Sequence, residues 1–192
     1  MAIADLTRQR LVRAALELFT TQGYHDTTTG QIARKAGVAE GTIYKHFQSK
    51  QHLLNELYRG AARWAARAAE EADGGPGPVR DRLQALAQRL VAGAAQDPAV
   101  MQLYFVDRVG ALLDDKSRDA GREFHTALER LLARGKSDGV IRPGAAEVWA
   151  GVWLAVIRQA LERVLARDWA EHSPGVRQSI DAAWAALSRS GG

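Results

Sequence analysis

Apolar residues recur every three or four positions along most of the chain, which is the spacing of an α-helix. The first such segment runs from about Leu6 to Gln22, where Leu11, Leu18 and Phe19 belong to one apolar stripe and Gly23 is placed to end the helix. No run of alternating β-branched residues predicts a strand. The pattern therefore predicts an all-α fold of about nine helices.

Polar start and stop signals divide the following residues into two short helices and a long one. Thr28 and Gln31 have the spacing of a capping box and predict a short helix that stops at Gly37. A second short helix is predicted a few residues later, over about 40–47. Ser49 then opens a long helix that continues to about residue 72.

The strongest helix breaker in the chain is the run Gly74-Gly75-Pro76-Gly77-Pro78, which separates two parts of different composition. Beyond it, apolar spacing and start signals predict five more helices. Their expected ranges are about 79–94, 97–105, 115–137, 145–168 and 174–189.

Two short helices joined by a tight turn that contains glycine form a helix-turn-helix, whose second helix enters the major groove of DNA. Gly37 can take the positive φ that ends the first helix, and Val38, Ile43 and Phe47 are placed to pack the second helix onto its own domain. The residues left on its outer face are rich in hydrogen-bonding groups: Glu40, Gly41, Thr42, Tyr44, Lys45 and His46. We therefore expect this face to contact DNA.

The charge distribution agrees with a polyanion partner. Of the net charge of +4, +3 lies in residues 1–59. Lys45 and Lys50 can neutralise phosphates, Tyr44 can donate its hydroxyl to one, and Thr42 and His46 can reach base edges. A solvated basic face would carry the same small excess, so the charge supports DNA binding only together with the motif.

One long stretch resembles a known family. Residues 27–58 read TTTGQIARKAGVAEGTIYKHFQSKQHLLNELY and follow AALELF, and this pattern is similar to the DNA-binding domain of TetR (tetracycline-repressor) family transcriptional regulators. The resemblance implies that phosphates are held by Thr28, Thr29, Tyr44 and Lys50, and that bases are read by Glu40, Gly41, Thr42, Lys45 and His46. It also implies three partners: a double-stranded DNA operator, a second copy of the chain and a small-molecule effector.

Two residues depart from the family pattern. Ala39 stands where relatives often have serine as N-cap, which should weaken the cap of the second short helix by about 1 kcal/mol. Gly30 lacks a side chain where relatives often carry a polar group near DNA.

The family layout also implies a division into domains. It gives a helix-turn-helix domain over residues 1–50, a connecting helix over 51–74, and a ligand-binding and dimerisation domain over 75–192. The last two helices are expected to pair with those of a second subunit in a four-helix bundle, since their apolar arc is wide. The expected interface residues are Val156, Ala160, Val164, Ile180, Ala183, Trp184 and Leu187. The alternative is a monomer whose own chain wraps the central helix.

An effector cavity is expected among the middle helices, where aromatic side chains and a few polar ones could line it. The candidates are Tyr104, Phe105, Arg108, Phe124, His125, Trp149 and Trp153. If Arg108 or Arg158 faces inward, the ligand is expected to be anionic or carbonyl-bearing; if both are solvated, the cavity is essentially hydrophobic. For any one of these aromatic residues, a place in the core is the simpler interpretation.

Several function classes find no support in the sequence. The chain has no cysteine, which excludes disulfides, thiolate metal sites and a cysteine nucleophile. Its histidines lack zinc spacing, and no phosphate loop, serine-hydrolase motif or carboxylate pair is present, so we expect no metal, no cofactor and no enzymatic activity. The first residues lack the apolar core of an export signal, and the longest apolar run, 148–157, is too short to cross a bilayer. We therefore expect a cytoplasmic protein that does not contact membranes.

Together these features predict a homodimeric, ligand-responsive transcriptional regulator. The expected mechanism is repression from a palindromic operator and release by a small molecule. The alternative is a regulator that activates transcription, or one that works through a protein partner without small-molecule induction.

Overall fold

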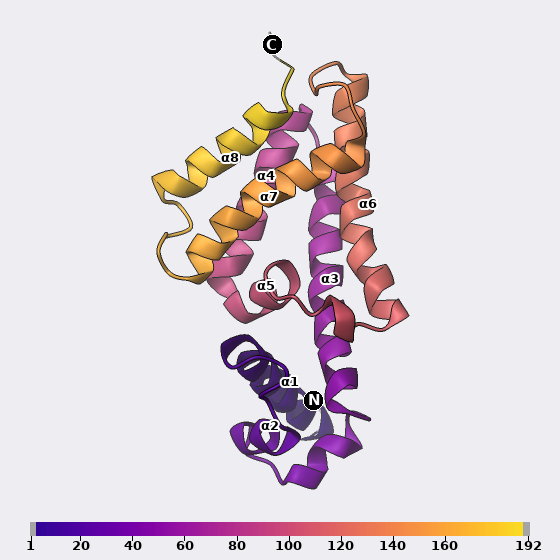
Figure 1. The fold of residues 1–192 in the computed structure, drawn as a ribbon, viewed down its shortest axis with the longest axis vertical. Coiled ribbons are helices and arrows are strands. Elements are labelled where there is room, and N and C mark those ends of the chain that lie inside the picture. The colour runs from indigo at the N-terminus through magenta and orange to yellow at the C-terminus, as the bar shows by residue number, and fades with distance from the viewer. Residues whose placement is uncertain (1–2, 190–192) are drawn as a thin grey trace.

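The computed structural model describes residues 3–189, which fold into eight α-helices and two short 3-10 helices (Figure 1). The described residues contain no strand, and their one isolated β-bridge joins Ile141 to Ser188. The elements are α1 (Ile3–Thr21), α2 (Thr29–Ala36), η1 (Glu40–Lys45), α3 (Lys50–Gly74), α4 (Val79–Gln96), α5 (Pro98–Phe105), η2 (Gly110–Leu112), α6 (Asp115–Ser137), α7 (Ala146–Leu165) and α8 (Pro174–Leu187). The predicted all-α fold is confirmed.

Side-chain caps fix where several helices begin. The Ser49 hydroxyl accepts from the His52 amide at 3.0 Å at the start of α3, and the Asp114 carboxylate accepts from the Ser117 amide at 2.8 Å at the start of α6. Each bond satisfies an amide that has no partner inside the first turn of its helix. These short-range signals explain why the predicted starts of α3 and α6 lie within one residue of the observed ones.

The end of α7 differs from the expected one. The helix ends at Leu165, three residues before the predicted Asp168. Arg167 takes a φ of +62°, the left-handed conformation that stops a helix and that non-glycine residues rarely adopt. The Arg163 guanidinium then lies 2.8 Å from the Asp168 carboxylate across this turn.

Two hydrophobic cores lie along the molecule. The first is formed by α1, α2, η1 and the start of α3, with Leu11, Ile32, Phe47 and Leu53 among its buried residues. The second fills the space among α3, α4, α6, α7 and α8. Figure 1 shows α3 running from the N-terminal helices into the larger bundle, so this one helix belongs to both cores. The exact domain boundaries stay a prediction.

Small residues let the helices of the bundle approach α3 closely. Its buried face within the second core is almost entirely alanine, from Ala61 to Ala69. On α6, which packs along α3, a Cβ at Gly121 would lie 2.7 Å from the Tyr58 hydroxyl oxygen. A larger residue at Gly121 would therefore require the Tyr58 side chain or α6 itself to shift.

Candidate nucleic-acid interface

α2 begins and ends as its sequence predicts. The Thr28 hydroxyl accepts from the Gln31 amide at 3.2 Å, and the Gln31 side chain accepts from the Thr28 amide at 2.7 Å, so the predicted capping box is present. Gly37 ends the helix with a φ of +65°, and the Val38 amide donates to the Ala33 carbonyl at 3.0 Å. This left-handed turn directs the chain into η1.

The second helix of the motif is shorter and tighter than expected. It is a 3-10 helix over Glu40–Lys45, where an α-helix to Phe47 was predicted. The Ala39 side chain gives no cap, and only backbone bonds such as Thr42 N–H to the Ala39 carbonyl at 2.9 Å close the first turn. Ile43 and Phe47 are buried and hold the segment onto α1 and α3.

The residues expected to face DNA do lie on one exposed surface. Glu40, Gly41, Tyr44 and Lys45 are exposed, while Thr42 and His46 are half-buried. The Tyr44 side chain is among the few large apolar ones left in solvent, at 57% exposure. Its hydroxyl lies 3.1 Å from that of Thr29, which joins η1 to the first turn of α2. Thr28 is also exposed, beside Thr29.

The two predicted phosphate-binding lysines differ in the structure. The Lys50 ammonium donates to the Tyr24 carbonyl at 2.8 Å and the Thr27 carbonyl at 2.7 Å, and it lies 4.2 Å from the centre of the Tyr24 ring. In the free chain it therefore stabilises the α1–α2 turn, and a phosphate would have to replace a carbonyl to reach it. Lys45 has no side-chain partner within residues 3–189 and keeps its charge available.

Gly30, one of the two departures from the family pattern, lies against the Glu40 side chain. A Cβ at this position would lie 3.1–3.3 Å from the Glu40 carboxylate. The carboxylate therefore rests against the first turn of α2, where the helix dipole favours a negative charge. Glu40 was expected to read bases, but in the free chain it faces α2.

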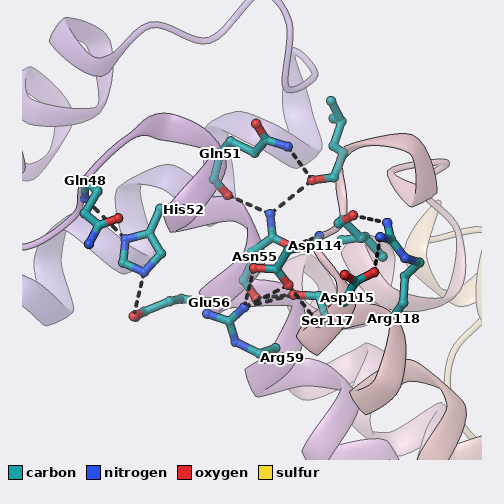
Figure 2. Close-up of polar contacts among 12 residues, drawn as sticks. Gln48, Gln51, His52, Asn55, Glu56, Arg59, Asp114, Asp115, Ser117 and Arg118 are labelled. Atoms are coloured by element: carbon teal, nitrogen blue, oxygen red, sulfur yellow. Dashed lines mark hydrogen bonds and ion pairs between the residues drawn. The ribbon is translucent and has the colours of Figure 1, made fainter.

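A polar network between α3 and the start of α6 was not predicted (Figure 2). Its centre is Asn55, which is 2% exposed. The Asn55 amide nitrogen donates to the Leu112 carbonyl at 3.0 Å, and its oxygen accepts from the Asp114 amide at 2.8 Å. Asn55 is the single asparagine of the chain and interrupts an apolar stripe, which is the sequence signal that could have revealed it.

Arg59 completes this network from the next turn of α3. Its guanidinium donates to the Asp114 carboxylate at 3.1 Å and to the Ser117 hydroxyl at 3.0 Å (Figure 2). Hydrogen bonds from Ser117, with the charge of Arg59, lower the pKa of Asp114 below its ordinary value. The helix that follows the DNA-facing motif is thus tied to the first turn of α6.

Three of the seven predicted ligand-binding residues are buried in the core of the bundle. Phe124 and Trp153 are fully buried core residues, and Phe105 is 5% exposed. The rings of Tyr104 and Phe105 lie 4.7 Å apart, and those of Phe105 and Phe124 lie 5.6 Å apart, so these aromatic side chains fill the space between helices. An effector cavity at these residues stays a prediction; in this structure the rings of Tyr104, Phe105 and Phe124 pack against one another.

The remaining candidates are spread over the surface. Arg108, His125 and Arg158 are exposed, so neither arginine faces inward. Trp149 is half-buried and donates to the Pro143 carbonyl at 3.3 Å.

A cavity of about 910 Å³ lies elsewhere, between α1, α3, α4 and α5. We call it the junction cavity. Its lining includes Arg8, Arg13, Gly60, Arg63, Trp64 and Met101, and none of the seven candidates.

The predicted dimer residues separate into two groups. Ala160, Ala183 and Leu187 have no exposed surface, and Val164 and Ile180 retain under a tenth of theirs. The pairing of α7 with α8 and the packing of both onto α4 cover these five side chains, so they have almost no surface to offer a second subunit. Val156 and Trp184 remain partly exposed.

Neither a metal site nor a membrane span is found within residues 3–189. They hold no group of three or more histidine, cysteine or acidic side chains arranged to bind a metal ion. None of their helices combines the length and the apolar character that a membrane span requires.

The chain is similar in sequence and in structure to known bacterial regulatory proteins. Residues 11–57 match the bacterial regulatory proteins of the tetR family. The transcriptional regulator TcmR of Streptomyces glaucescens is 31% identical over 177 residues, which cover 85% of this chain and 73% of TcmR. The regulator SrpR of Pseudomonas putida is 55% identical over 56 residues, but this match spans only 26% of SrpR and 29% of this chain.

A solved structure agrees over nearly the whole chain. The tetR family transcription regulator of Shewanella sp. PV-4 superposes with a TM-score of 0.77 at 26% identity, covering 95% of this chain and 98% of that one. The likeness therefore includes the helical bundle as well as the DNA-facing motif.

Proposed function

Because the chain belongs to the tetR family of bacterial regulatory proteins, we propose that it is a homodimeric repressor that binds a palindromic operator and leaves it when a small molecule binds. The observation that carries the proposal is the exposed surface of η1 and α2. There Tyr44, bonded to Thr29, stands beside Lys45 on a segment whose inner side is fixed by buried Ile43 and Phe47.

Each outer group has a use against a duplex. The hydroxyls of Tyr44 and Thr29 share one hydrogen bond, which leaves one hydroxyl hydrogen to donate to a phosphate, and the free ammonium of Lys45 adds a charge. Thr42 and Gly41 lie on the same segment, where the missing side chain of Gly41 allows close approach to base edges; a Cβ there would meet nothing within 4 Å.

A palindromic operator requires two motifs held at a fixed spacing of about one helical turn of DNA. The outer surface of α7 and α8 supports such a dimer. Val156 on α7 and Trp184 on α8 remain partly exposed, and α8 packs at the edge of the bundle against α7 and α4 (Figure 1). These two residues replace the larger set expected from the sequence as the centre of the proposed interface.

Release by a ligand requires a connection between the bundle and the DNA-facing motif. α3 supplies it, since it is shared by both cores and is tied to the start of α6 by Asn55 and Arg59. A ligand that binds more tightly to an arrangement with the wrong motif spacing would shift the population away from DNA.

The test is a fluorescence anisotropy titration of the full chain against the DNA upstream of its own gene, repeated at several salt concentrations. Lys45→Gln should weaken binding and reduce the slope of log K against log salt by about 0.9, the value for one lost phosphate contact. Lys116→Gln, which removes an equal charge from an exposed position on α6, should leave the slope unchanged. Tyr44→Phe should weaken binding to all sequences alike, because it removes a phosphate donor.

Two results would contradict the proposal. If Lys45→Gln and Lys116→Gln change the titration equally, η1 is not the DNA-facing element. If the wild-type chain shows no salt-dependent affinity for any genomic fragment, the alternative of a regulator that acts through a protein partner is favoured.

A further inference from the structure

The junction cavity lies where the first core meets the second. Its walls come from α1, α3, α4 and α5, and its volume of about 910 Å³ is within the range of small-molecule sites. Leu57 on its wall packs against the first core, and Met101 belongs to the second core. A molecule bound here would therefore contact the DNA-facing part and the bundle at once.

The polar part of the cavity is strongly basic. Five arginines line it, against only two carboxylates, those of Glu56 and Asp97. The arginines of α1 are already paired: Arg8 with Glu56, and Arg13 with Asp97 at 2.9 Å.

Two arginines of α3 differ from these. Arg63 and Arg67 stand one turn apart on the same side of the helix and have no hydrogen-bond or ion-pair partner within residues 3–189. They leave two unpaired guanidinium groups at one edge of the cavity.

Another part of the cavity lining is apolar. Trp64 lies against α4 because Gly93 has no side chain; a Cβ at Gly93 would be 2.7 Å from the indole ring and 3.3 Å from the Met101 sulfur. Leu57 and Val100 extend this surface. A ligand with an apolar body and a charged end would match both parts.

Gly60 is a second, independent indication. It lies inside α3, where glycine destabilises a helix relative to alanine, and a Cβ built there would meet nothing within 4 Å. No close packing therefore requires a glycine. A side chain at this position would instead project into the junction cavity, which Gly60 lines.

We propose that the junction cavity binds an amphipathic carboxylate, with its carboxylate on Arg63 and Arg67 and its apolar body on Trp64 and Met101. Planar guanidinium groups bind carboxylates through paired charge-assisted hydrogen bonds, which are stronger than neutral ones. The bound carboxylate would also compete with Glu56 and Asp97 for the arginines of α1. The inference that binding changes DNA affinity rests on the proposed function; the inference that the cavity binds this ligand class does not.

The first test is isothermal titration of the full chain with decanoate, and with decan-1-ol and decyltrimethylammonium, which have the same apolar chain but a neutral or a positive end. Decanoate should bind at least about tenfold more tightly than either. The double variant Arg63→Gln/Arg67→Gln should weaken decanoate binding by about tenfold or more. The matched control Arg80→Gln/Lys116→Gln loses the same charge at exposed positions outside the cavity lining and should bind decanoate as the wild type does.

The second test places a large side chain in the cavity, between its arginines and Trp64, without disturbing the fold. Gly60→Leu should abolish decanoate binding, while its urea midpoint stays equal to that of the wild type or rises, because leucine favours the helix. Equal decanoate affinity in Gly60→Leu and wild type would overturn the proposal. So would equal weakening by the two double variants, since it would show a general charge effect.

A third experiment, with DNA present, distinguishes failure of this proposal from failure of the proposed function. Decanoate added to the protein–DNA complex should lower its anisotropy in the wild type but not in Gly60→Leu. If the protein binds decanoate at this cavity but no DNA fragment, the site stands and the repressor proposal fails. If it binds DNA but Gly60→Leu still responds to decanoate, the site proposal fails alone.

Discussion

Replacing Asn55 by alanine tests the network that joins α3 to α6. The wild-type side chain is 2% exposed, accepts from the Asp114 amide at 2.8 Å and donates to the Leu112 carbonyl at 3.0 Å. Alanine removes these two bonds to the 112–114 segment, and also the bond from the Asn55 amide nitrogen to the Gln51 carbonyl at 2.9 Å within α3. We expect the variant to fold and to be less stable.

The two lost bonds do not cost the same. The Leu112 carbonyl still accepts from the Gln51 side chain at 2.9 Å, so it keeps a partner. The Asp114 amide loses the acceptor that Asn55 provides in a partly buried bond, and a donor left without its acceptor costs about 1–3 kcal/mol. We therefore expect the free energy of unfolding to fall by about 2 kcal/mol.

Urea unfolding followed by circular dichroism measures this change, at one fixed protein concentration because association would add to the apparent stability. With a slope of about 2 kcal/mol per molar urea, the midpoint should fall by about 1 M. The control is Gln88→Ala, an exposed position on α4, which should stay within about 0.5 kcal/mol of the wild type.

One result would refute this reasoning. If Asn55→Ala unfolds within about 0.5 kcal/mol of the wild type, as the Gln88 control is expected to do, then water or a local shift replaces the Asn55 acceptor. In that case the contact between α3 and the start of α6 is not held by this side chain. The proposed path from the bundle to the DNA-facing motif then loses its main contact.

The remaining predictions concern caps and charge. Ala39→Ser should raise the free energy of unfolding by about 0.5–1 kcal/mol in the same urea assay, because it supplies the side-chain cap that η1 lacks; an unchanged midpoint would show that the 3-10 turn cannot use one. Asp114 has a lowered pKa in the folded chain. Its charge therefore stabilises the fold above the unfolded pKa of about 3.9, and this stabilisation is lost as the pH falls below that value. Asp114→Asn keeps the capping oxygen for Ser117 and should therefore flatten the fall in stability between about pH 5 and pH 3, whereas an equally steep fall would assign it to other carboxylates.

The sequence was sufficient where the determining contacts are local. The capping box of Thr28 and Gln31, the left-handed Gly37 and the cap at Ser49 each involve residues within a few positions of one another, and all three are present. The exposed side of η1 follows from the same short-range pattern, because Ile43 and Phe47 must turn inward.

The sequence was insufficient where a side chain's partner is distant in the chain. Asp97 directly precedes α5 but makes no side-chain cap bond, and it pairs instead with Arg13 of α1. Lys50 bonds to carbonyls about 23–26 positions before it. A helical stripe shows that Phe124 is inward but not which neighbours fill the space beside it, so its packing against Phe105 could not be predicted.

The position of the Asn55 contact also has a mechanical consequence. Asn55 lies five residues into α3, so with a rise of 1.5 Å per residue the arm on the motif side is about 8 Å long, while the arm toward Gly74 is about 28 Å. A short arm bends little. If α3 tilts as a rigid rod about the contact with 112–114, a movement at its far end reaches the start of α3 reduced about three- to fourfold.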